Sequence, residues 1–336
     1  MTPEITASPH RHTPGLVSVV MAARDAGRWI ADALASVALQ DYPSIEAIVV
    51  DDGSHDDTAL IAAQFADRLP LRIIREHGRG PAAARNRGLD AASGEFIQFL
   101  DADDAIESTK ISLQFEFART TGSDVVWGSF ERAFDAGEGL AAARRITVEP
   151  ILGNDAEADL ISSGGFVPLA SALIRRSGPL GSVRMPEHMR VLEDIQYHFA
   201  LIAAGAVYRR QPGSSGLIVR EHSTPTRASL ASAESFWRAC VENAIDRESK
   251  WHANGTLSRY RRRILASIYV YAARELAAVA PQSARDAAGR ARHVDERYFD
   301  FVSPRLRLPT RVFGLYNVER LASFGRSFRR AMIRRP

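Results

Sequence analysis

Residues 16–58 read LVSVVMAARDAGRWIADALASVALQDYPSIEAIVVDDGSHDDT, and residues 80–104 read GPAAARNRGLDAASGEFIQFLDADD. Short apolar runs rich in β-branched residues alternate there with stretches whose apolar residues recur at helical spacing. The predicted strands are Leu16–Met21, Ile45–Val50, Leu71–Ile74 and Phe96–Leu100, and the predicted helices are Gly27–Leu39, Thr58–Phe65 and Pro81–Ala92. This alternation predicts an α/β fold, in which a Rossmann-like, mostly parallel central sheet carries helices on both faces.

Acidic residues follow three of these predicted strands: Asp25, then Asp51 with Asp52, then Asp101 with Asp103 and Asp104. Ligands of open parallel sheets collect beyond the carboxyl ends of the strands, so we expect these side chains to share one edge. Each acid taken alone is better explained as a helix cap or a turn former, and only the joint arrangement points to a site. Carboxylates packed together repel unless a cation neutralises them. Hard oxygen ligands that leave positions open for phosphates predict Mg²⁺ or Mn²⁺.

The stretch His77–Asn86 predicts a helix start that binds phosphate. Glycines and small residues lead into it, a helix N-terminus attracts anions, and Arg85 adds a planar cationic fork. Asp52 offers acceptors for a base or a ribose. The P-loop pattern GxxxxGK[ST] is absent, and the missing GxGxxG after the first strand argues against a nicotinamide cofactor. These residues favour a nucleotide donor with a diphosphate.

Cysteine content and the first residues bound the compartment. Cys240 is the only cysteine, which excludes an intrachain disulfide and a cysteine-rich zinc site and fits a reducing compartment. Residues 1–15 lack an apolar stretch, so we expect a flexible polar tail rather than a signal peptide. No segment approaches the roughly 18 apolar residues of a membrane span. We therefore expect a cytoplasmic protein.

Beyond Asp104 the pattern loosens, and the chain divides near residue 230. Residues 128–165 predict irregular structure with a short helix near 154–161. The other predicted elements are helices over Ser108–Arg119 and Glu193–Ala204 and strands over Asp124–Trp127, Leu169–Arg175, Ala206–Arg210 and Gly216–Arg220. From residue 231 onward the spacing is helical, over Ala233–Asn254, Ser258–Val279 and Ala284–His293. We therefore predict a tail over 1–15, an α/β domain over 16–230 and a helical region over 231–336.

The order of motifs between Val17 and Asp104 resembles the family 2 glycosyltransferases of the GT-A fold. The resemblance rests on the VDDGS turn, the ARN-x-G helix, the GE-aromatic-I strand and the Asp-x-Asp pair at Asp101 and Asp103. A weaker resemblance continues to about residue 230, through FVPLASALIRRSG and the Glu193-Asp194 pair. It implies transfer of a sugar from a nucleotide-diphospho-sugar to an acceptor hydroxyl, with inversion by a single displacement. The acceptors of such enzymes are often glycans or lipid-linked glycans of the cell envelope.

The resemblance also implies roles for single residues. Asp52 would hold the base with Asp51 behind it, and Arg85 would face the diphosphate. In the Asp101-Ala102-Asp103 segment, Asp103 would bind the metal directly and Asp101 would lie nearer the ribose and donor sugar. Asp194 would be the general base, and His222 would close over the diphosphate or the metal. The family's Pro-x-Tyr-Asn is Ala22-Ala23-Arg24-Asp25 here, so Arg24 takes the place of the aromatic residue that stacks on the base.

Each of these residues also has a simpler explanation. Asp194 could be a helix N-cap and His222 an exposed loop histidine, and Trp29 is expected to pack its own helix. Trp127, Trp237 and Trp251 are read as packing residues. Two other functions stay open: an inactive scaffold of the same fold that binds a nucleotide sugar or a glycan, and a nucleotidyltransferase.

Charge is concentrated at the C-terminal end. Residues 305–336 hold nine Arg and one acid, Glu319, a net of +8, whereas the whole chain carries +3, so the rest sums to −5. Apolar residues recur there at helical spacing: Leu315, Val318, Leu321, Ala322, Gly325, Phe328 and Met332. A basic amphipathic helix of this kind binds an anionic membrane surface peripherally. The alternatives are docking on the acidic body of the protein itself and, less favoured, nucleic acid.

Overall fold

A computed structural model describes residues 12–135, 139–162, 164–189, 191–222 and 233–323. The chain divides into two compact units. Unit 1 comprises Met1–Pro150 with Val167–Ser223, and unit 2 comprises Ile151–Phe166 with Thr224–Pro336. The segment 151–166 thus leaves the α/β unit and packs with the helical unit.

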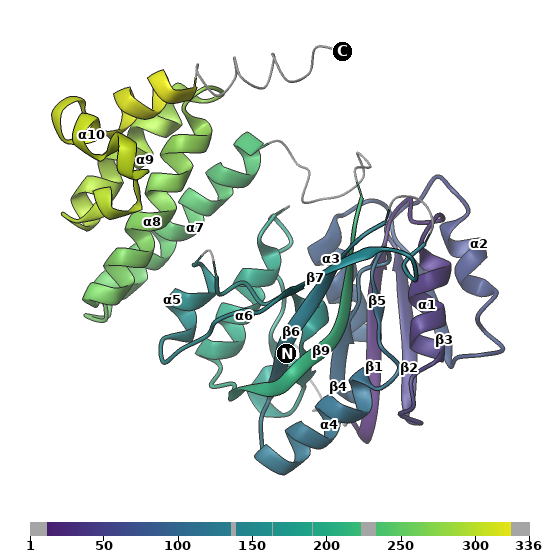
Figure 1. Ribbon diagram of the computed structural model, residues 1–336. Helices are drawn as coiled ribbons and strands as arrows, with labels where there is room; N and C mark the ends of the chain where they lie inside the picture. Colours follow the sequence, from purple (N-terminus) through teal and green to yellow (C-terminus); the bar gives the residue numbers. More distant parts are fainter. Residues whose placement is uncertain (1–11, 136–138, 163, 190, 223–232, 324–336) are drawn as a thin grey trace, which may run out of the picture. The chain divides into compact units, whose positions relative to one another are not determined.

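Unit 1 is built around one mixed sheet (Figure 1). Its first four strands are parallel and run in the order β3-β2-β1-β4, which confirms the parallel start that the alternating sequence predicts. The rest of the sheet continues β8-β6-β9-β5, with antiparallel pairs β4–β8, β6–β8 and β5–β9, and with β7 paired to β6. The strands are β1 (Thr13–Ala23), β2 (Ile45–Asp51), β3 (Leu71–Arg75), β4 (Gly94–Phe99), β5 (Ala105–Ile106), β6 (Val125–Phe134), β7 (Arg144–Val148), β8 (Leu173–Arg175) and β9 (Tyr208–Glu221).

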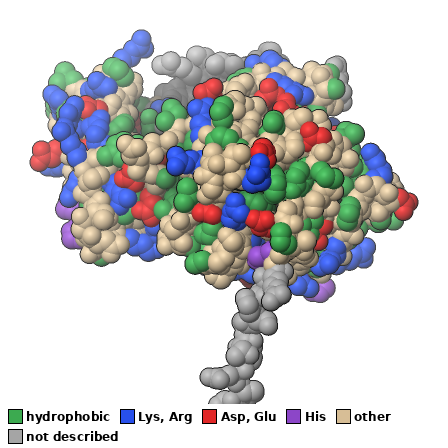
Figure 2. Space-filling view, turned by 90° about the horizontal axis from the view of Figure 1, so that it is seen from below, with side chains coloured by type: hydrophobic (Ala, Val, Ile, Leu, Met, Phe, Trp, Pro, Cys, Tyr) green, Lys and Arg blue, Asp and Glu red, His purple; other side chains and the backbone are tan. Residues whose placement is uncertain are grey.

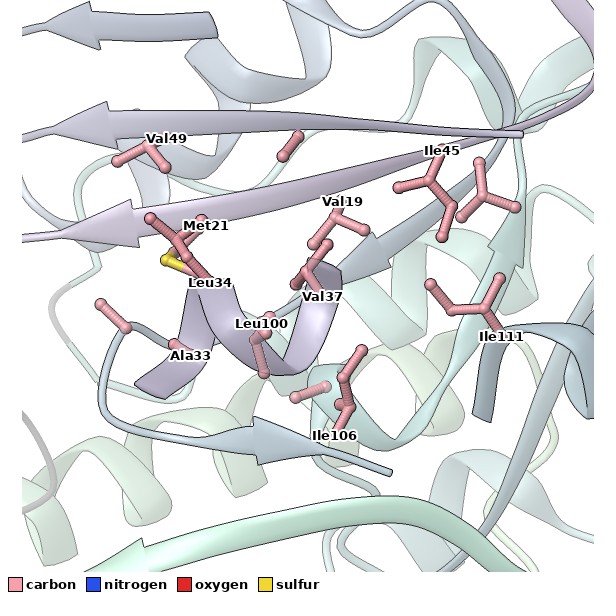
Figure 3. Packing of buried hydrophobic residues seen from close by; sticks show 14 of the residues in the cluster. Val19, Met21, Ala33, Leu34, Val37, Ile45, Val49, Leu100, Ile106 and Ile111 are labelled. Carbon is pink, nitrogen blue, oxygen red and sulfur yellow. The ribbon is translucent and has the colours of Figure 1, made fainter. Parts of the chain in front are cut away.

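Helices cover both faces of this sheet. Side chains alternate along β1, so this strand presents apolar side chains to a helix on each face. Val19 and Met21 pack in the main core with the apolar face of α1, including Leu34 and Val37 (Figure 3). Val20 points the other way and contacts Gly88 of α3, where a Cβ would overlap with it. The helices of this unit are α1 (Ile30–Ala38), α2 (Thr58–Ala63), α3 (Pro81–Ala91), α4 (Lys110–Thr121) and α6 (Glu193–Ala203), with short 3₁₀ turns at Leu169–Ser171 and Gly178–Ser182.

The predictions for residues 128–220 were wrong in part. The expected irregular stretch holds most of β6 and all of β7. The two strands predicted over Ala206–Arg210 and Gly216–Arg220 are one strand, β9, which pairs with β6 through two register shifts. Gly213 and Gly216 in its middle have φ of 78° and 73°. Glycines in left-handed conformations are typical of turns, but here they mark irregularities inside a continuous strand.

Unit 2 is a helical cluster with an alanine-rich core. Its helices are α5 (Ala156–Leu160), α7 (Ala233–Ala253), α8 (Arg259–Leu276), α9 (Pro281–Val294) and α10 (Arg307–Phe313), with 3₁₀ turns at Tyr298–Phe301 and Pro304–Leu306. Residues 315–323 are also helical. Arg261 pairs with Asp155, and the Trp251 indole N–H donates to Glu157 at 2.9 Å. These contacts fix the segment 151–166 onto α7 and α8.

The first part of the predicted C-terminal amphipathic helix docks on unit 2 itself. Leu315 and Tyr316 lie in the core of the unit, and Val318 is buried. The remainder of that helix, from residue 324, lies outside the described residues. Within the described residues, no helix has the length and apolar content needed to cross a membrane. On the face shown in Figure 2, basic, acidic and hydrophobic side chains lie interspersed.

Candidate active site

The acidic turns lie at the carboxyl edge of the parallel strands. β1 pairs with both β2 and β4, so the three strands end side by side. The turn after β2 is tied to β1, because the Asp52 N–H donates to the carbonyl of Ala23 at 2.8 Å. Asp25 joins the same turn through Ser54, whose hydroxyl accepts from the Asp25 N–H at 3.0 Å. The Asp-x-Asp segment follows β4 directly.

Asp103 lies against His222. Its carboxylate oxygen Oδ2 is 2.8 Å from His222 Nε2, and the imidazole is largely buried. The ring of Trp29 stacks on the imidazole, with centroids 4.2 Å apart and planes 19° from parallel. Trp29 therefore does more than pack its own helix. Its ring packs against the imidazole that contacts Asp103 of the Asp-x-Asp segment.

Arg220 fixes the backbone of that segment from β9. Its side chain is 3% exposed and its Nε donates to the Asp103 carbonyl at 3.1 Å. The two remaining guanidinium nitrogens pair with Asp32 at 2.6 Å and Asp135 at 2.7 Å. The Arg220 N–H also donates to the buried carboxylate of Asp104 at 2.9 Å. These charge-assisted contacts of a buried cation tie the Asp-x-Asp segment to β9.

Two of the predicted metal-binding side chains suit a divalent cation. Asp103 supplies a carboxylate oxygen and His222 an imidazole nitrogen. The two atoms now form a hydrogen bond, and a bound cation would take its place. No cluster of three or more such ligand residues occurs among the described residues. An ion held here would complete its shell with phosphate oxygens and water, as Mg²⁺ and Mn²⁺ do. Asp101, the third predicted ligand, is turned toward Arg85 instead.

Arg85 links the Asp-x-Asp segment to α6. One guanidinium nitrogen lies 2.8 Å from Asp101 Oδ1 and the other 2.8 Å from Glu193 Oε1, and the side chain is 13% exposed. Burial lowers the pKa of the guanidinium, but the carboxylates of Asp101 and Glu193 outweigh it and raise the pKa. Sequence reasoning missed Glu193, although it precedes Asp194 directly in the pair that was singled out.

Asp194 lies beside Glu193 in the first turn of α6. Burial and the neighbouring Glu193 carboxylate raise its pKa to about 7, although Arg85 opposes them. Its Oδ1 accepts a local bond from the Ile195 N–H at 2.8 Å. The alternative that Asp194 caps α6 is wrong, because the N-cap is Leu192, which adopts a left-handed φ of 64°. A half-buried carboxyl that titrates near neutrality suits a general base.

Asp52 holds the loop that precedes α3. Its two carboxylate oxygens accept from the N–H groups of Arg79 and Gly80, both at 2.8 Å, and this holds the loop that leads into α3. Asp51 is also buried and accepts from the Ser54 N–H at 2.9 Å. The role of Asp52 in binding a base stays a prediction, since its oxygens serve the loop in this structure.

The other predicted nucleotide-binding residues lie at the same edge. The Arg24 side chain is 49% exposed and lies against Gly78. Ala22 stands on β1 opposite Val50 of β2, next to the acidic turn. Ala102 is buried between the two acids of the Asp-x-Asp pair.

Comparison with known sequences finds similarity to one family. Residues 18–178 match the profile of Glycosyl transferase family 2. A UDP-Glc:alpha-D-GlcNAc-diphosphoundecaprenol beta-1,3-glucosyltransferase of Escherichia coli, WfgD, is 34% identical over 116 residues, which cover 34% of this chain and 46% of that protein. The succinoglycan biosynthesis protein ExoO of Rhizobium meliloti is 27% identical over 244 residues, covering 66% of this chain and 68% of ExoO. This chain thus spans less than half the length of WfgD.

Comparison with solved structures identifies the fold. Residues 1–349 of TarS from S. aureus, solved in complex with UDP-GlcNAc, align with a TM-score of 0.64 at 20% identity. The alignment covers 94% of this chain and 92% of that one, so it takes in helices of unit 2 as well as the sheet. At this identity the likeness concerns the fold alone. Residues 18–178 are therefore similar to the family 2 glycosyltransferases, and the chain shares the fold of TarS.

Proposed function

We propose that this chain is an inverting glycosyltransferase that moves a sugar from a nucleotide-diphospho-sugar to an acceptor hydroxyl. The observation that supports it most is the Arg85 bridge between Asp101 and Glu193. This bridge brings the Asp-x-Asp segment, which belongs to the donor side, next to Asp194 on α6. Donor and base are then in reach of one reacting centre, as a single displacement requires.

In this proposal Asp194 accepts the proton of the attacking hydroxyl. Its pKa of about 7 leaves it partly ionised at neutral pH and basic enough to take a proton. Glu193 and Arg85 position it, because the Glu193–Arg85 pair holds the start of α6 against the Asp-x-Asp segment. Mg²⁺ or Mn²⁺ bound by Asp103 and His222 would supply neutralising charge for the diphosphate leaving group.

The donor side of the proposal rests on Asp52, Arg24 and Arg85. Asp52 holds the loop before α3, whose N-terminus faces the acidic turns, and we assign the base and ribose to this place. Arg24, half-exposed beside Gly78, is the side chain available to stack on a base. Arg85 and Asp101 would have to exchange partners when diphosphate, ribose or metal arrives, because each now binds the other.

The acceptor and the place of action are the finer parts of the proposal. WfgD is named for a diphosphoundecaprenol-linked acceptor and ExoO for succinoglycan biosynthesis. By analogy we propose a glycan or lipid-linked glycan of the cell envelope as acceptor. We further propose that the enzyme is cytoplasmic and attaches peripherally to the inner face of the membrane, since its C-terminal segment is strongly basic. We propose no role for nucleic acid.

A ligand screen followed by product analysis tests this function. Nucleotides and nucleotide sugars are screened with Mn²⁺ by thermal shift, because a ligand that binds only the folded state raises apparent stability. Donors that bind are then offered with acceptors. Release of a nucleoside diphosphate supports sugar transfer, whereas release of pyrophosphate would show a nucleotidyltransferase. Binding without turnover across the donor panel would favour the inactive scaffold.

A further inference from the structure

Helix α10 turns an apolar face outward. Leu308, Val312 and Phe313 are 71%, 66% and 65% exposed. Leu308 and Val312, four residues apart, share one side of the helix, and Phe313 extends the exposed apolar surface at its last residue. Thr310, on the other side, is buried. Single exposed apolar residues are ordinary, but a group of large ones marks an interaction site. We name Leu308, Val312 and Phe313 the α10 face.

The α10 face stands on a well-packed base. Val302 before the helix and Leu315 and Tyr316 after it belong to the core of unit 2. The Arg307 guanidinium donates to the carbonyls of Val302 and Asp300, at 3.2 Å and 2.9 Å. The three apolar side chains are therefore held outward by packed flanks on both sides of the helix.

The surroundings of the α10 face are cationic. Arg305, Arg311 and Arg320 are exposed, and Leu321 adds a further apolar side chain that is 72% exposed. Within residues 301–323 the one acidic residue is Glu319, and its side chain is buried. The exposed side chains of residues 301–323 thus include large apolar and basic residues and no acid.

An anionic lipid leaflet matches both properties at once. Apolar side chains enter the boundary between headgroups and acyl chains, while arginines meet the negative headgroups. Nucleic acid would match the arginines and leave the apolar side chains in water. A second copy of the same face would bring like charges together, which disfavours a symmetric pair.

We propose that the α10 face inserts into an anionic membrane leaflet, with Arg305, Arg311 and Arg320 at the headgroups. This rests on the proposed function, in which the acceptor is carried by a lipid at that surface. It moves the expected contact from the helix that begins at Leu315, whose first apolar residues are buried, to the neighbouring helix. Each part of the contact is a described side chain.

The test uses the full chain and vesicles of phosphatidylcholine with or without phosphatidylglycerol. The variant carries Leu308→Ser, Val312→Ser and Phe313→Ser together. All three side chains are largely exposed, so we expect the variant to keep the fold. The matched control carries Leu60→Ser, Leu113→Ser and Val279→Ser, which are 63%, 57% and 55% exposed elsewhere on the chain. Sedimentation gives the partition coefficient, and nucleoside diphosphate release from the donor in solution reports the active site.

We expect the unaltered chain and the control to bind phosphatidylglycerol vesicles at low salt and to dissociate as salt screens the charges. The α10 variant should bind at least about tenfold more weakly, since three apolar side chains no longer enter the lipid. Its release of nucleoside diphosphate should be unchanged. A fluorophore on Val312→Cys, in a Cys240→Ser background, should shift to the blue with phosphatidylglycerol vesicles.

Three results would overturn the proposal. The α10 variant could bind vesicles as tightly as the unaltered chain, or the unaltered chain could fail to bind them at low salt. The third result is an unaltered chain that forms a dimer and a variant that is monomeric. The last would show that the face joins two copies. If neither the unaltered chain nor any variant turns over a donor, the proposed function is refuted instead. Vesicle binding is measured without donor and does not depend on turnover.

Discussion

Asp194 shows how one residue's surroundings set its chemistry. An aspartate in water is ionised far below neutral pH, but burial beside Glu193 raises the pKa of Asp194 to about 7. The base must be ionised to accept a proton. We therefore predict that kcat/KM falls as pH drops through about 7 and levels off above it. A pH profile measured with saturating metal checks this, and a rate that is flat from pH 5.5 to 8.5 would contradict it.

Replacing Asp194 by Asn separates a base from a structural role. The amide keeps the shape but cannot take a proton, so we expect kcat to fall at least about 10²-fold while donor affinity changes little. The pKa of Asp194 is higher in the folded protein than in the unfolded chain. Its contribution to stability is therefore greatest at low pH, where the carboxyl is neutral, and is lost as pH rises toward 7 and the buried group ionises. Urea unfolding at pH 8 should therefore show Asp194→Asn at least as stable as the parent. A marked destabilisation would assign Asp194 to the fold.

Trp29 illustrates a residue whose partner the sequence does not reveal. Its stack on His222 holds the imidazole that meets Asp103. We predict that Trp29→Leu weakens Mn²⁺ binding about tenfold, the lower range for residues that orient a metal ligand. Trp29→Phe keeps an aromatic face and should retain most of the affinity. Titration of Mn²⁺ followed by electron paramagnetic resonance measures both, and equal affinities for Leu and Phe variants would refute the positioning role.

Single residues were predictable where a motif names them and not where the fold supplies the partner. Asp103 and His222 are 119 residues apart and were expected together from the family pattern. Glu193 and Arg220 were not expected in the site, because their roles come from ion pairs with Arg85, Asp32 and Asp135 across long chain separations. Nothing in the local sequence of either residue encodes these partners.

At the level of elements, regular alternation was readable and irregular strands were not. The four parallel strands came from short β-branched runs between helical stretches, since buried strands have that texture. β9 was divided in two because Gly213 and Gly216 resemble turn residues, and β7 was missed because four of its five residues are exposed and carry no apolar pattern. Pairing with β6, rather than local propensity, makes both of them strands.

The contact between α3 and β1 gives a prediction at this scale. Gly88 lets α3 approach Val20, and an added Cβ would overlap with that side chain. We expect Gly88→Ala to destabilise the protein by about 1–3 kcal/mol, the usual cost of overpacking. Val20→Ala should relieve part of the loss when both changes are combined. Urea unfolding of the two single variants and the double variant tests it, and strictly additive losses would contradict the contact.

At the level of the whole molecule, the chain order hides how the two units are built. The expected boundary near residue 230 follows the change of texture, but segment 151–166 packs with the helical unit through Arg261 and Trp251. Such an excursion cannot be read from composition, because its ion pairs join residues about a hundred positions apart. The helical unit therefore includes a segment that is preceded and followed in the sequence by residues of the α/β unit.

The central claim is sugar transfer at the carboxyl edge, and analysis of the transfer products tests it most directly. The purified full chain is incubated with Mn²⁺, a panel of nucleotide sugars and lipid-linked or synthetic glycan acceptors, beside Asp103→Ala and Asp194→Asn. We predict release of nucleoside diphosphate with a glycosylated product of inverted anomeric configuration, and loss of both with either variant while each remains folded. Normal turnover by Asp103→Ala, or a product of retained configuration, would contradict the account.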